Sequence, residues 1–575
     1  MSTYQVGGGR RRSLARTGAV SAALLSVALV ASPRTSSTRV VYETARPVCH
    51  LPRHRGFSAC LAFRRVISRH SAPGARRVIL PVKTGTDTIG PAGGLTPIDL
   101  AGAYGFNPAL ASGSTQTVAI VDAYNDPDLP ADLQTFDAKY GLPACDSSCL
   151  TVVGESGGSP AAGNDTSGWS VEQALDVETV HSVCEQCKIL LVQANTDSNA
   201  DLATAVNTAA GLNATEISNS YGSPETETSP STTAAYNHPG IVITASTGDD
   251  GYYSFDDLDG TNQPDDPASL NTVVAVGGTS LFLSQTGHRG SELVWNDNGP
   301  QGFFEQAFGE SLGATGGGCS TGTAARPWQS GIATWSDTAC GSHRLDADIA
   351  AVADPFTGFD VYSSFNCGSD CPVLGWQTLG GTSLASPLIA AMFALAGGSQ
   401  GVSYPALTLY GHLGTSALFD VTSGGNGWCD GEGAVQCGDP NALGVGILDC
   451  DYPASGSTPS AGDLACDAAP GYDGPTGVGT PTGLGAFAKT GPSARVTGPT
   501  KVKHGTKETW TAKALDPFPG GHVTSYSWNW GDGGQVSTGP SATHVFAKAG
   551  TLTIDVTLTD SYNMTGSATL KVLVK

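Results

Sequence analysis

Charged residues are scarce in this chain, and basic residues are scarcer still. Asp, Glu, Lys and Arg make up 14% of the 575 residues. Residues 96–490 contain only 6 Lys and Arg against 44 Asp and Glu. So few cations cannot neutralise a phosphate backbone, which excludes nucleic acid as a partner. Protonation in acid would bring this region toward neutrality. An acidic working medium is one interpretation, and a merely soluble acidic surface is the other.

The chain also lacks an apolar stretch long enough to span a bilayer, which needs about 20 residues. We therefore expect no membrane attachment. The apolar stretch Ala19 to Ala31 follows four arginines between residues 10 and 16 and precedes Ser32-Pro33. This pattern is typical of a secretory signal, so we interpret residues 1–31 as a signal peptide and expect a secreted protein. Residues 32–93 are basic, without clear periodicity, and we interpret them as a removable pro-segment or, alternatively, a flexible linker.

Cysteine is present in an even number, 14, and most cysteines have a near neighbour in the chain. Close pairs are Cys145/Cys149, Cys184/Cys187, Cys367/Cys371 and Cys429/Cys437. In an exported chain, this pattern favours disulfides. Zinc is the alternative at Cys184-x-x-Cys187, but no second C-x-x-C motif or spaced His pair accompanies it.

Strand and helix patterns alternate through the middle of the chain. We expect strands at 117–124, 189–193, 216–221, 241–247 and 273–276, and helices at 130–140, 171–183, near 201–210 and near 232. Such alternation predicts an α/β fold, with a parallel sheet covered by helices on both faces. Ligands of these sheets bind beyond the carboxyl ends of the strands.

The stretch Gly380-Gly-Thr-Ser-Leu-Ala-Ser-Pro387 precedes an apolar run, Leu388 to Ala396. It predicts a glycine turn that leads into a buried helix, with Ser383 in the first turn. The free N–H groups of such a turn can face a developing negative oxygen, so Ser383 is a candidate nucleophile for acyl transfer. The alternative is an ordinary glycine turn with an N-capping hydroxyl.

Histidine, the usual base of a serine hydrolase, is poorly placed here. None of the five histidines between residues 96 and 490 stands in a His-Gly-Thr-His-type turn, and imidazole would be protonated in acid.

Glu172 and Asp176 are four residues apart on a predicted helix, so they share one face and could share a proton. The alternative is a solvated helix face, which is the commoner case for such pairs. Asp249 follows a strand and, if protonated, could donate to an oxyanion; a plain turn is the alternative.

Together these motifs resemble the sedolisins, the serine-carboxyl peptidases. The resemblance covers residues 94–490 and includes the nucleophile stretch, Glu172-Gln-Ala-Leu-Asp176 and Gly248-Asp-Asp-Gly251. It implies a subtilisin-like fold and an acid-acting endopeptidase of protein or peptide substrates, which we expect to be monomeric. Ser383 would be the nucleophile, Glu172 the base, Asp176 its partner and Asp249 the oxyanion donor. The matching strand would bind substrate backbone through Ser220, Tyr221 and Gly222.

The resemblance also implies one structural Ca²⁺ ion. Its ligands would be the side chains of Asp420 and Asp473 with the carbonyls of Val421, Ala469 and Gly471, a hard-oxygen set that calcium prefers. Two features depart from the family. The pro-segment is short for the family, which puts the mode of latency in doubt. A cysteine-rich stretch between Asp420 and Asp473 is interpreted as a disulfide-pinned insertion.

Residues 491–575 show alternating apolar residues separated by turns, which predicts a small all-β sandwich. The stretch Trp528-Asn-Trp-Gly-Asp-Gly533 resembles the polycystic-kidney-disease (PKD) repeat. Two alternatives to an acid peptidase remain open. One is a neutral subtilisin-like protease that uses His. The other is a catalytically inactive sedolisin-like module that binds surfaces.

Overall fold

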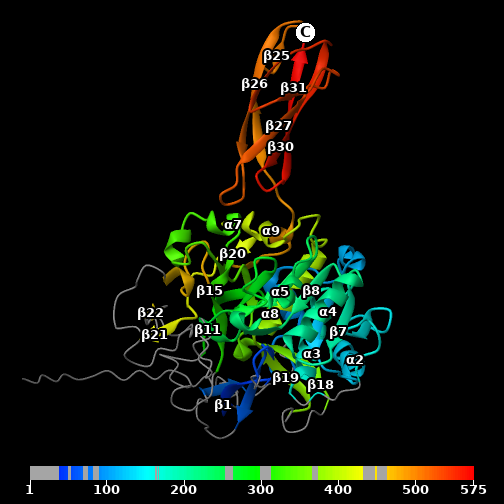
Figure 1. Ribbon diagram of the computed structural model, residues 1–575, viewed down its shortest axis with the longest axis vertical. Helices are drawn as coiled ribbons and strands as arrows, with labels where there is room; N and C mark the ends of the chain where they lie inside the picture. The colour runs from blue at the N-terminus through cyan, green and yellow to red at the C-terminus, as the bar shows by residue number, and fades with distance from the viewer. Residues whose placement is uncertain are drawn as a thin grey trace, which may run out of the picture.

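We describe the protein from a computed structural model, which covers residues 38–49, 54–68, 76–81, 90–161, 165, 167–252, 263–297, 312–365, 373–430, 447–449 and 463–575. A large α/β body carries a narrow β-sandwich that projects from one end and contains the C-terminus (Figure 1). The expected signal peptide, the Cys367/Cys371 pair and most of the cysteine-rich insertion lie outside the described residues.

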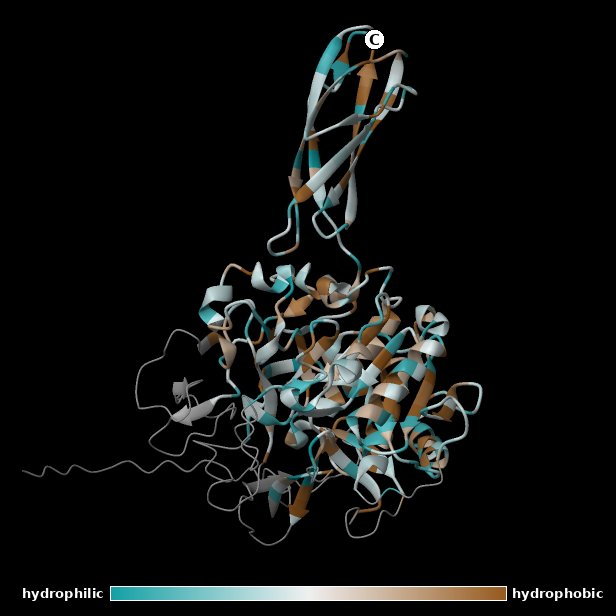
Figure 2. Ribbon diagram, viewed as in Figure 1, coloured by the Kyte–Doolittle hydropathy of each residue, from teal (hydrophilic) through white to brown (hydrophobic). Residues whose placement is uncertain are grey.

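The body is built on a largely parallel sheet. Its strand order is β14-β13-β10-β8-β5-β7-β6, and β17 pairs with β13. The strands are β5 (Thr117–Ala123), β6 (Leu150–Gly154), β7 (Lys188–Ala194), β8 (Glu216–Asn219), β10 (Val242–Ser246), β13 (Val274–Leu283), β14 (Arg289–Val294) and β17 (Ile349–Val352). The apolar centres of these strands are brown in Figure 2, and Val118 to Val121 have no exposed surface. The predicted strands and the parallel arrangement are confirmed.

Three helices cover the sheet, α3 (Trp169–Val183), α4 (Asn199–Gly211) and α8 (Thr382–Leu395), and α2 (Leu129–Tyr140) packs on α3. Helix α8 packs against β8, β10, β13 and β17 and also contacts α3, while α4 packs against β5, β7 and β8. Every residue of α3 and α8 is buried. These two helices therefore lie inside the body, and a polar residue on either of them must face other protein groups rather than water. Among the described residues, no helix is both long and apolar enough to cross a membrane.

The N-terminal segment is part of this fold. Strands β1 (Thr38–Pro47), β3 (Phe63–Ser68) and β4 (Arg76–Pro81) join β18 (Phe359–Ser363) and β19 (Gly375–Gly380) in one sheet, in the order β18-β19-β3-β1-β4. Phe63 packs with Ala45, Trp295 and Ala353 in a small core. The flexible-linker interpretation is therefore wrong for strands β1, β3 and β4. These strands lack clear periodicity in the sequence; β1 pairs with β3 and β4, and β3 joins the body through β19, far along the chain.

Four disulfides join described cysteines: Cys49–Cys60, Cys145–Cys149, Cys184–Cys187 and Cys319–Cys340. The two expected neighbour pairs that lie within the described residues are confirmed. Because Cys184 and Cys187 are oxidised to each other, the zinc alternative at this motif is wrong.

A buried ion pair supports the edge of the sheet. Arg344 donates to both carboxylate oxygens of Asp348, at 3.2 and 2.6 Å, and the Tyr410 hydroxyl donates to one of them at 2.8 Å. Replacing Asp348 by Ala would leave the Arg344 charge buried without its partner. We expect the free energy of unfolding to fall by about 3 to 5 kcal/mol, measured by urea denaturation. The exposed control Asp337→Ala should change it by less than about 0.5 kcal/mol, and an equal effect of both would contradict the prediction.

The C-terminal region forms two facing sheets, β24-β26-β29 and β25-β31-β30-β27-β28. These strands are β24 (Ser493–Thr497), β25 (Lys501–Val502), β26 (Lys507–Leu515), β27 (Val523–Asn529), β28 (Ser537–Thr538), β29 (Ser541–Val545), β30 (Gly550–Asp560) and β31 (Thr565–Val574). Trp510, Trp528 and Trp530 fill the core between the sheets. The expected all-β sandwich is confirmed. It touches the body through Tyr562, whose ring lies 5.8 Å from that of Trp328.

Candidate active site

The start of α8 positions Ser383. Gly381 has φ of 97°, a backbone conformation that strongly favours glycine, and a Cβ atom added there would lie only 2.2 Å from the Leu61 carbonyl oxygen. The turn therefore needs glycine both for its conformation and for the close approach of another chain segment. Ser383 follows in the first turn of the helix, where its backbone N–H has no helical acceptor. The predicted turn and helix are confirmed.

Ser383 is fully buried, and its polar atoms contact two other segments. Its backbone N–H donates to the Leu61 carbonyl oxygen at 2.9 Å. Its hydroxyl donates to the Ser220 carbonyl oxygen at 3.2 Å. The nucleophile candidate therefore lies beside the carboxyl end of β8, which agrees with the edge expected for ligands of a parallel sheet.

Glu172 and Asp176 point from α3 into the same region. Neither side chain has exposed surface, and the Ser383 and Ser220 hydroxyls are their nearby donors. Burial raises the pKa of Glu172 well above its ordinary value, and the charges of Asp176 and Asp122 raise it further, whereas the Ser383 hydroxyl lowers it. Burial also raises the pKa of Asp176, and the Ser220 hydroxyl lowers it. The pair is thus internal, which is the opposite of the solvated face considered as the alternative.

A further carboxyl group, Asp122, belongs to this cluster and was missed from the sequence. It lies in β5, has no exposed surface, and burial raises its pKa to about 8. Its charge raises the pKa of both Glu172 and Asp176. The available signal was an Asp at the end of an otherwise apolar strand, Val118-Ala-Ile-Val-Asp122. Three buried carboxyl groups this close favour sharing of protons over full ionisation.

Asp249 approaches Ser383 from the end of β10. One carboxyl oxygen accepts hydrogen bonds from the Thr382 N–H and hydroxyl, both at 2.8 Å. The other oxygen is buried and has no partner among the described residues. Burial raises the pKa of Asp249 well above its ordinary value, although the two Thr382 bonds act in the opposite direction. A protonated Asp249 would have a donor to offer a neighbouring oxygen.

Imidazole groups are occupied away from Ser383. His181 bonds to the Pro143 carbonyl, His238 to Asn207, His288 to the Gly102 carbonyl and His412 to the Ala488 carbonyl. The fifth, His343, is exposed in β16 (His343–Asp346). None of these five histidines is therefore in a position to act as the base for Ser383, which argues against the neutral, His-dependent alternative.

The expected substrate-binding residues lie along one side of the site. Ser220 is followed by β9 (Tyr221–Pro224), and β9 is paired with β2 (Ala59–Cys60) of the N-terminal segment. The Tyr221 hydroxyl is turned away, toward Asn219 at 2.9 Å and Tyr236 at 3.0 Å. Strand β9 therefore offers backbone groups to a neighbouring strand, as strand addition requires.

Four of the five expected calcium ligands, Asp420, Ala469, Gly471 and Asp473, come together in a separate loop region. Asp473 is fully buried; burial raises its pKa to about 7, and the charge of Asp420 contributes to the increase. The Ala469 N–H donates to Asp473 and the Gly471 N–H donates to Asp420, each at 3.1 Å. A buried carboxylate beside a second carboxylate is a donor set that fits a hard divalent cation, so the residues present fit the group.

Comparison with known proteins places these observations in a family. The profile of the subtilase family matches residues 156–443, and the PKD domain profile matches residues 489–574. Sedolisin of Pseudomonas sp. (strain 101) is 28% identical over 362 residues, which cover 59% of this chain and 57% of that protein. Xanthomonalisin of Xanthomonas sp. (strain T-22) is 30% identical over 399 residues, 61% of this chain and 45% of that protein.

The chain thus spans about half the length of these curated relatives. A solved structure, Pseudomonas sedolisin (serine-carboxyl proteinase) complexed with two molecules of pseudo-iodotyrostatin, superposes with a TM-score of 0.52 and 26% identity, over 68% of this chain and 96% of that one. The chain belongs to the subtilase family, is a homologue of sedolisin within it, and carries a C-terminal PKD domain.

Proposed function

We propose that this protein is a serine-type endopeptidase that acts in acid. The observation that carries the proposal is the burial of Glu172, Asp176 and Asp249 around a buried Ser383, while the five histidines between residues 96 and 490 lie elsewhere. With these neighbours, carboxyl groups must carry out the proton transfers of catalysis. The relatives named sedolisin and serine-carboxyl proteinase support the same assignment.

The mechanism follows from the positions of these groups. Ser383 attacks the peptide carbonyl carbon, and Glu172 accepts the hydroxyl proton and returns it to the leaving amine. Asp176 orients Glu172, and the two carboxyl groups share protons. The Ser383 N–H and protonated Asp249 stabilise the oxyanion. Burial raises the pKa of Asp249, which keeps this carboxyl group protonated and able to donate. The hydrogen bond from the Ser383 hydroxyl lowers the pKa of Glu172 and so favours the ionised form that accepts the proton.

The pH dependence of hydrolysis tests this function. We would measure digestion of a denatured protein between about pH 2 and pH 8, a range that spans carboxyl and imidazole titration, with Ser383→Ala as the blank. Activity that peaks in acid and is absent in the variant is the expected result. A maximum at neutral or alkaline pH would contradict the carboxyl mechanism. No hydrolysis at any pH would support the inactive surface-binding alternative.

We also propose that a Ca²⁺ ion binds at Asp420 and Asp473 and stabilises the fold. When bound, it would offset the charge of two adjacent carboxylates and tie the two loops together. Dialysis against a chelator should lower the midpoint of thermal unfolding, and added Ca²⁺ should restore it in a concentration-dependent way. The Asp473→Asn variant should lose the response to Ca²⁺. A wild-type midpoint that ignores both chelator and Ca²⁺ would contradict the site.

We propose, finally, that the protein works outside the cell as a monomer. The disulfides support this compartment, since such bonds persist in oxidising surroundings. The N-terminal sequence supports export.

A further inference from the structure

The N-terminal segment lies in the candidate active site in the way that a bound peptide would. Its strand β2 pairs antiparallel with β9, so that Ala59 faces Gly222 and Cys60 faces Tyr221. These are the positions expected to bind substrate backbone. The pairing supplies the main-chain contacts of strand addition, with the chain itself as the added strand.

The next residue, Leu61, places a specific peptide bond at the nucleophile. Its N–H donates to the Ser220 carbonyl oxygen at 3.2 Å, and its carbonyl oxygen accepts from the Ser383 N–H at 2.9 Å. A Cβ atom added to Gly381 would lie 2.2 Å from this carbonyl oxygen and 2.6 Å from the unpartnered oxygen of Asp249. The Leu61 carbonyl oxygen therefore occupies the position that the oxyanion donors serve.

We propose that residues Ser58–Ala62 are bound as a peptide substrate, and that the enzyme cuts its own Leu61–Ala62 bond. This rests on the proposed function. The Ser383 oxygen bonds to the Leu61 carbonyl carbon while its proton passes to Glu172. The Leu61–Ala62 bond breaks as that proton moves to the Ala62 nitrogen. Water then adds to the acyl carbon and gives a proton to Glu172, which returns it to Ser383 as the Leu61 carboxyl group leaves.

The bond is clamped on both sides, so the segment acts as a built-in inhibitor as well as a substrate. Before the bond, Cys60 is tied to Cys49 by a disulfide. After it, the Ala62 carbonyl accepts from the Val48 N–H at 2.8 Å, and β3 continues into the sheet with β1 and β19. Both new ends therefore stay in place after cleavage. The fragment that ends at Leu61 must leave before another substrate can enter.

The register of this segment also indicates which substrates fit. Leu61, the residue before the cut bond, is only 6% exposed, so its subsite encloses a medium-sized apolar side chain. Three residues earlier, the Ser58 hydroxyl donates to Asn199 at 2.9 Å, and Asn199 in turn donates to Ser223 at 2.9 Å.

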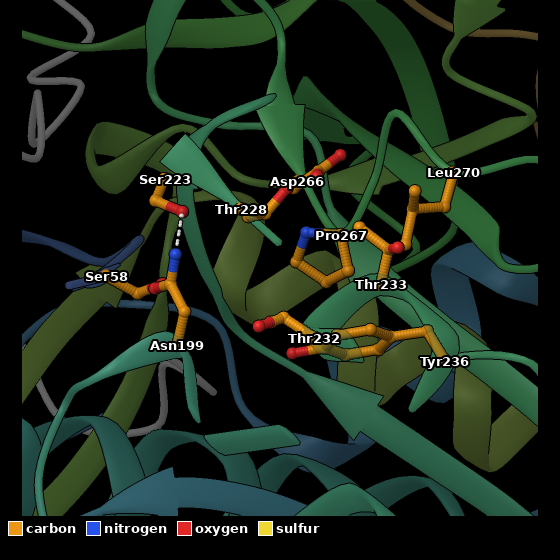
Figure 3. A pocket seen from close by; sticks show the side chains of 10 residues that line it. All are labelled: Ser58, Asn199, Ser223, Thr228, Thr232, Thr233, Tyr236, Asp266, Pro267 and Leu270. Carbon is orange, nitrogen blue, oxygen red and sulfur yellow. Dashed lines mark hydrogen bonds between the residues drawn. The ribbon is translucent and has the colours of Figure 1, made fainter. Parts of the chain in front are cut away.

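Figure 3 shows these three residues and the Thr228, Thr232 and Tyr236 side chains around the same small pocket. The space left for water in this pocket is about 10 Å³, about enough for one molecule. We infer a preference for Leu before the cut bond and for a small hydroxyl residue three positions earlier.

The test uses the full chain and its Ser383→Ala variant, incubated at about pH 4, where carboxyl groups titrate. Mass spectrometry and N-terminal sequencing should find a new N-terminus at Ala62 in the wild type only, formed at a rate independent of protein concentration. Digestion of other proteins without this cut would overturn the inference and leave the proposed function intact. Failure to hydrolyse any protein or peptide would overturn both.

Two variants on the same segment sharpen the result. Leu61→Asp should slow self-cleavage about 10- to 200-fold, the range for a poorly fitting side chain, whereas Ile67→Asp, at a position 42% exposed, should not. The joint change of Cys49 and Cys60 to Ser should hasten the appearance of activity after the cut. An unchanged lag in this variant would overturn the clamp.

Peptides provide a readout that does not depend on folding of the variants. A linear peptide of residues 56–65, given to the self-cleaved wild type, should be cut between Leu and Ala. Replacing its Leu by Asp, or its Ser58 equivalent by Phe, should each lower kcat/KM about 10-fold or more. Equal rates for all three peptides would overturn the inferred preference.

Discussion

The Glu172→Gln variant is expected to lose about 10²- to 10⁴-fold in kcat/KM, the contribution of a positioned general base and acid. Gln has the same size and keeps the buried position in α3, but it cannot accept the Ser383 proton. The loss should therefore appear in kcat with little change in KM, because Glu172 lies on α3 near the Ser383 hydroxyl and is not part of β9, the substrate strand. We also expect the variant to fold, because burying an uncharged Gln side chain costs less free energy than burying a carboxylate.

The measurement needs an open cleft, because residues 59–62 block it. We would add a recognition sequence for an unrelated neutral protease within residues 82–89, release the N-terminal segment at neutral pH, and assay peptide hydrolysis in acid. Asp337→Asn, a change at an exposed carboxyl group, is the matched control and should keep wild-type rates. If Glu172→Gln retained more than about a tenth of the wild-type kcat, Glu172 would not be the base.

Much of the body could be predicted because its elements have local signals. Val118 to Val121 form a continuous apolar run that only a fully buried strand explains, and the glycine turn before Ser383 requires the conformation that Gly381 adopts. The spacing of Glu172 and Asp176 placed them on one helical face. It could not show that this face is internal, because α3 is buried all around and has no polar side to identify.

What the sequence did not reveal depends on contacts between distant segments. Strand β3 is held by β19, and Val48 lies against Gly168 at the start of α3; neither partner is close in the chain. In the sequence, Asp122 is an ordinary residue at the end of a strand. In the fold, α3 places two carboxyl groups near it. The short pro-segment raised the question of latency, and the answer proposed here, Leu61 in the oxyanion position, follows from backbone register that no motif encodes.

Variants at Asp249 distinguish an oxyanion site that uses a carboxyl group from one that uses an amide. In the wild type, Asp249 must be protonated to donate, so activity should fall as pH rises through its pKa, which burial places well above the ordinary carboxyl value. Asp249→Ala removes the donor and should lower kcat about 10²- to 10³-fold at pH values below that pKa, with a smaller difference above it, where the wild type has also lost its donor. Asp249→Asn keeps an N–H donor that cannot ionise.

The Asn variant should therefore retain part of the activity and lose the alkaline fall that Asp249 causes. The acid limb, which requires an ionised carboxyl among Glu172, Asp176 and Asp122, should stay where it is, because that cluster is unchanged. The measurement is kcat against pH for the opened wild type, Asp249→Asn, Asp249→Ala and the surface control Asp337→Asn. An alkaline limb that is identical in the wild type and Asp249→Asn would show that a different group sets it. In that case Asp249 would hold the turn through Thr382 rather than bind the oxyanion.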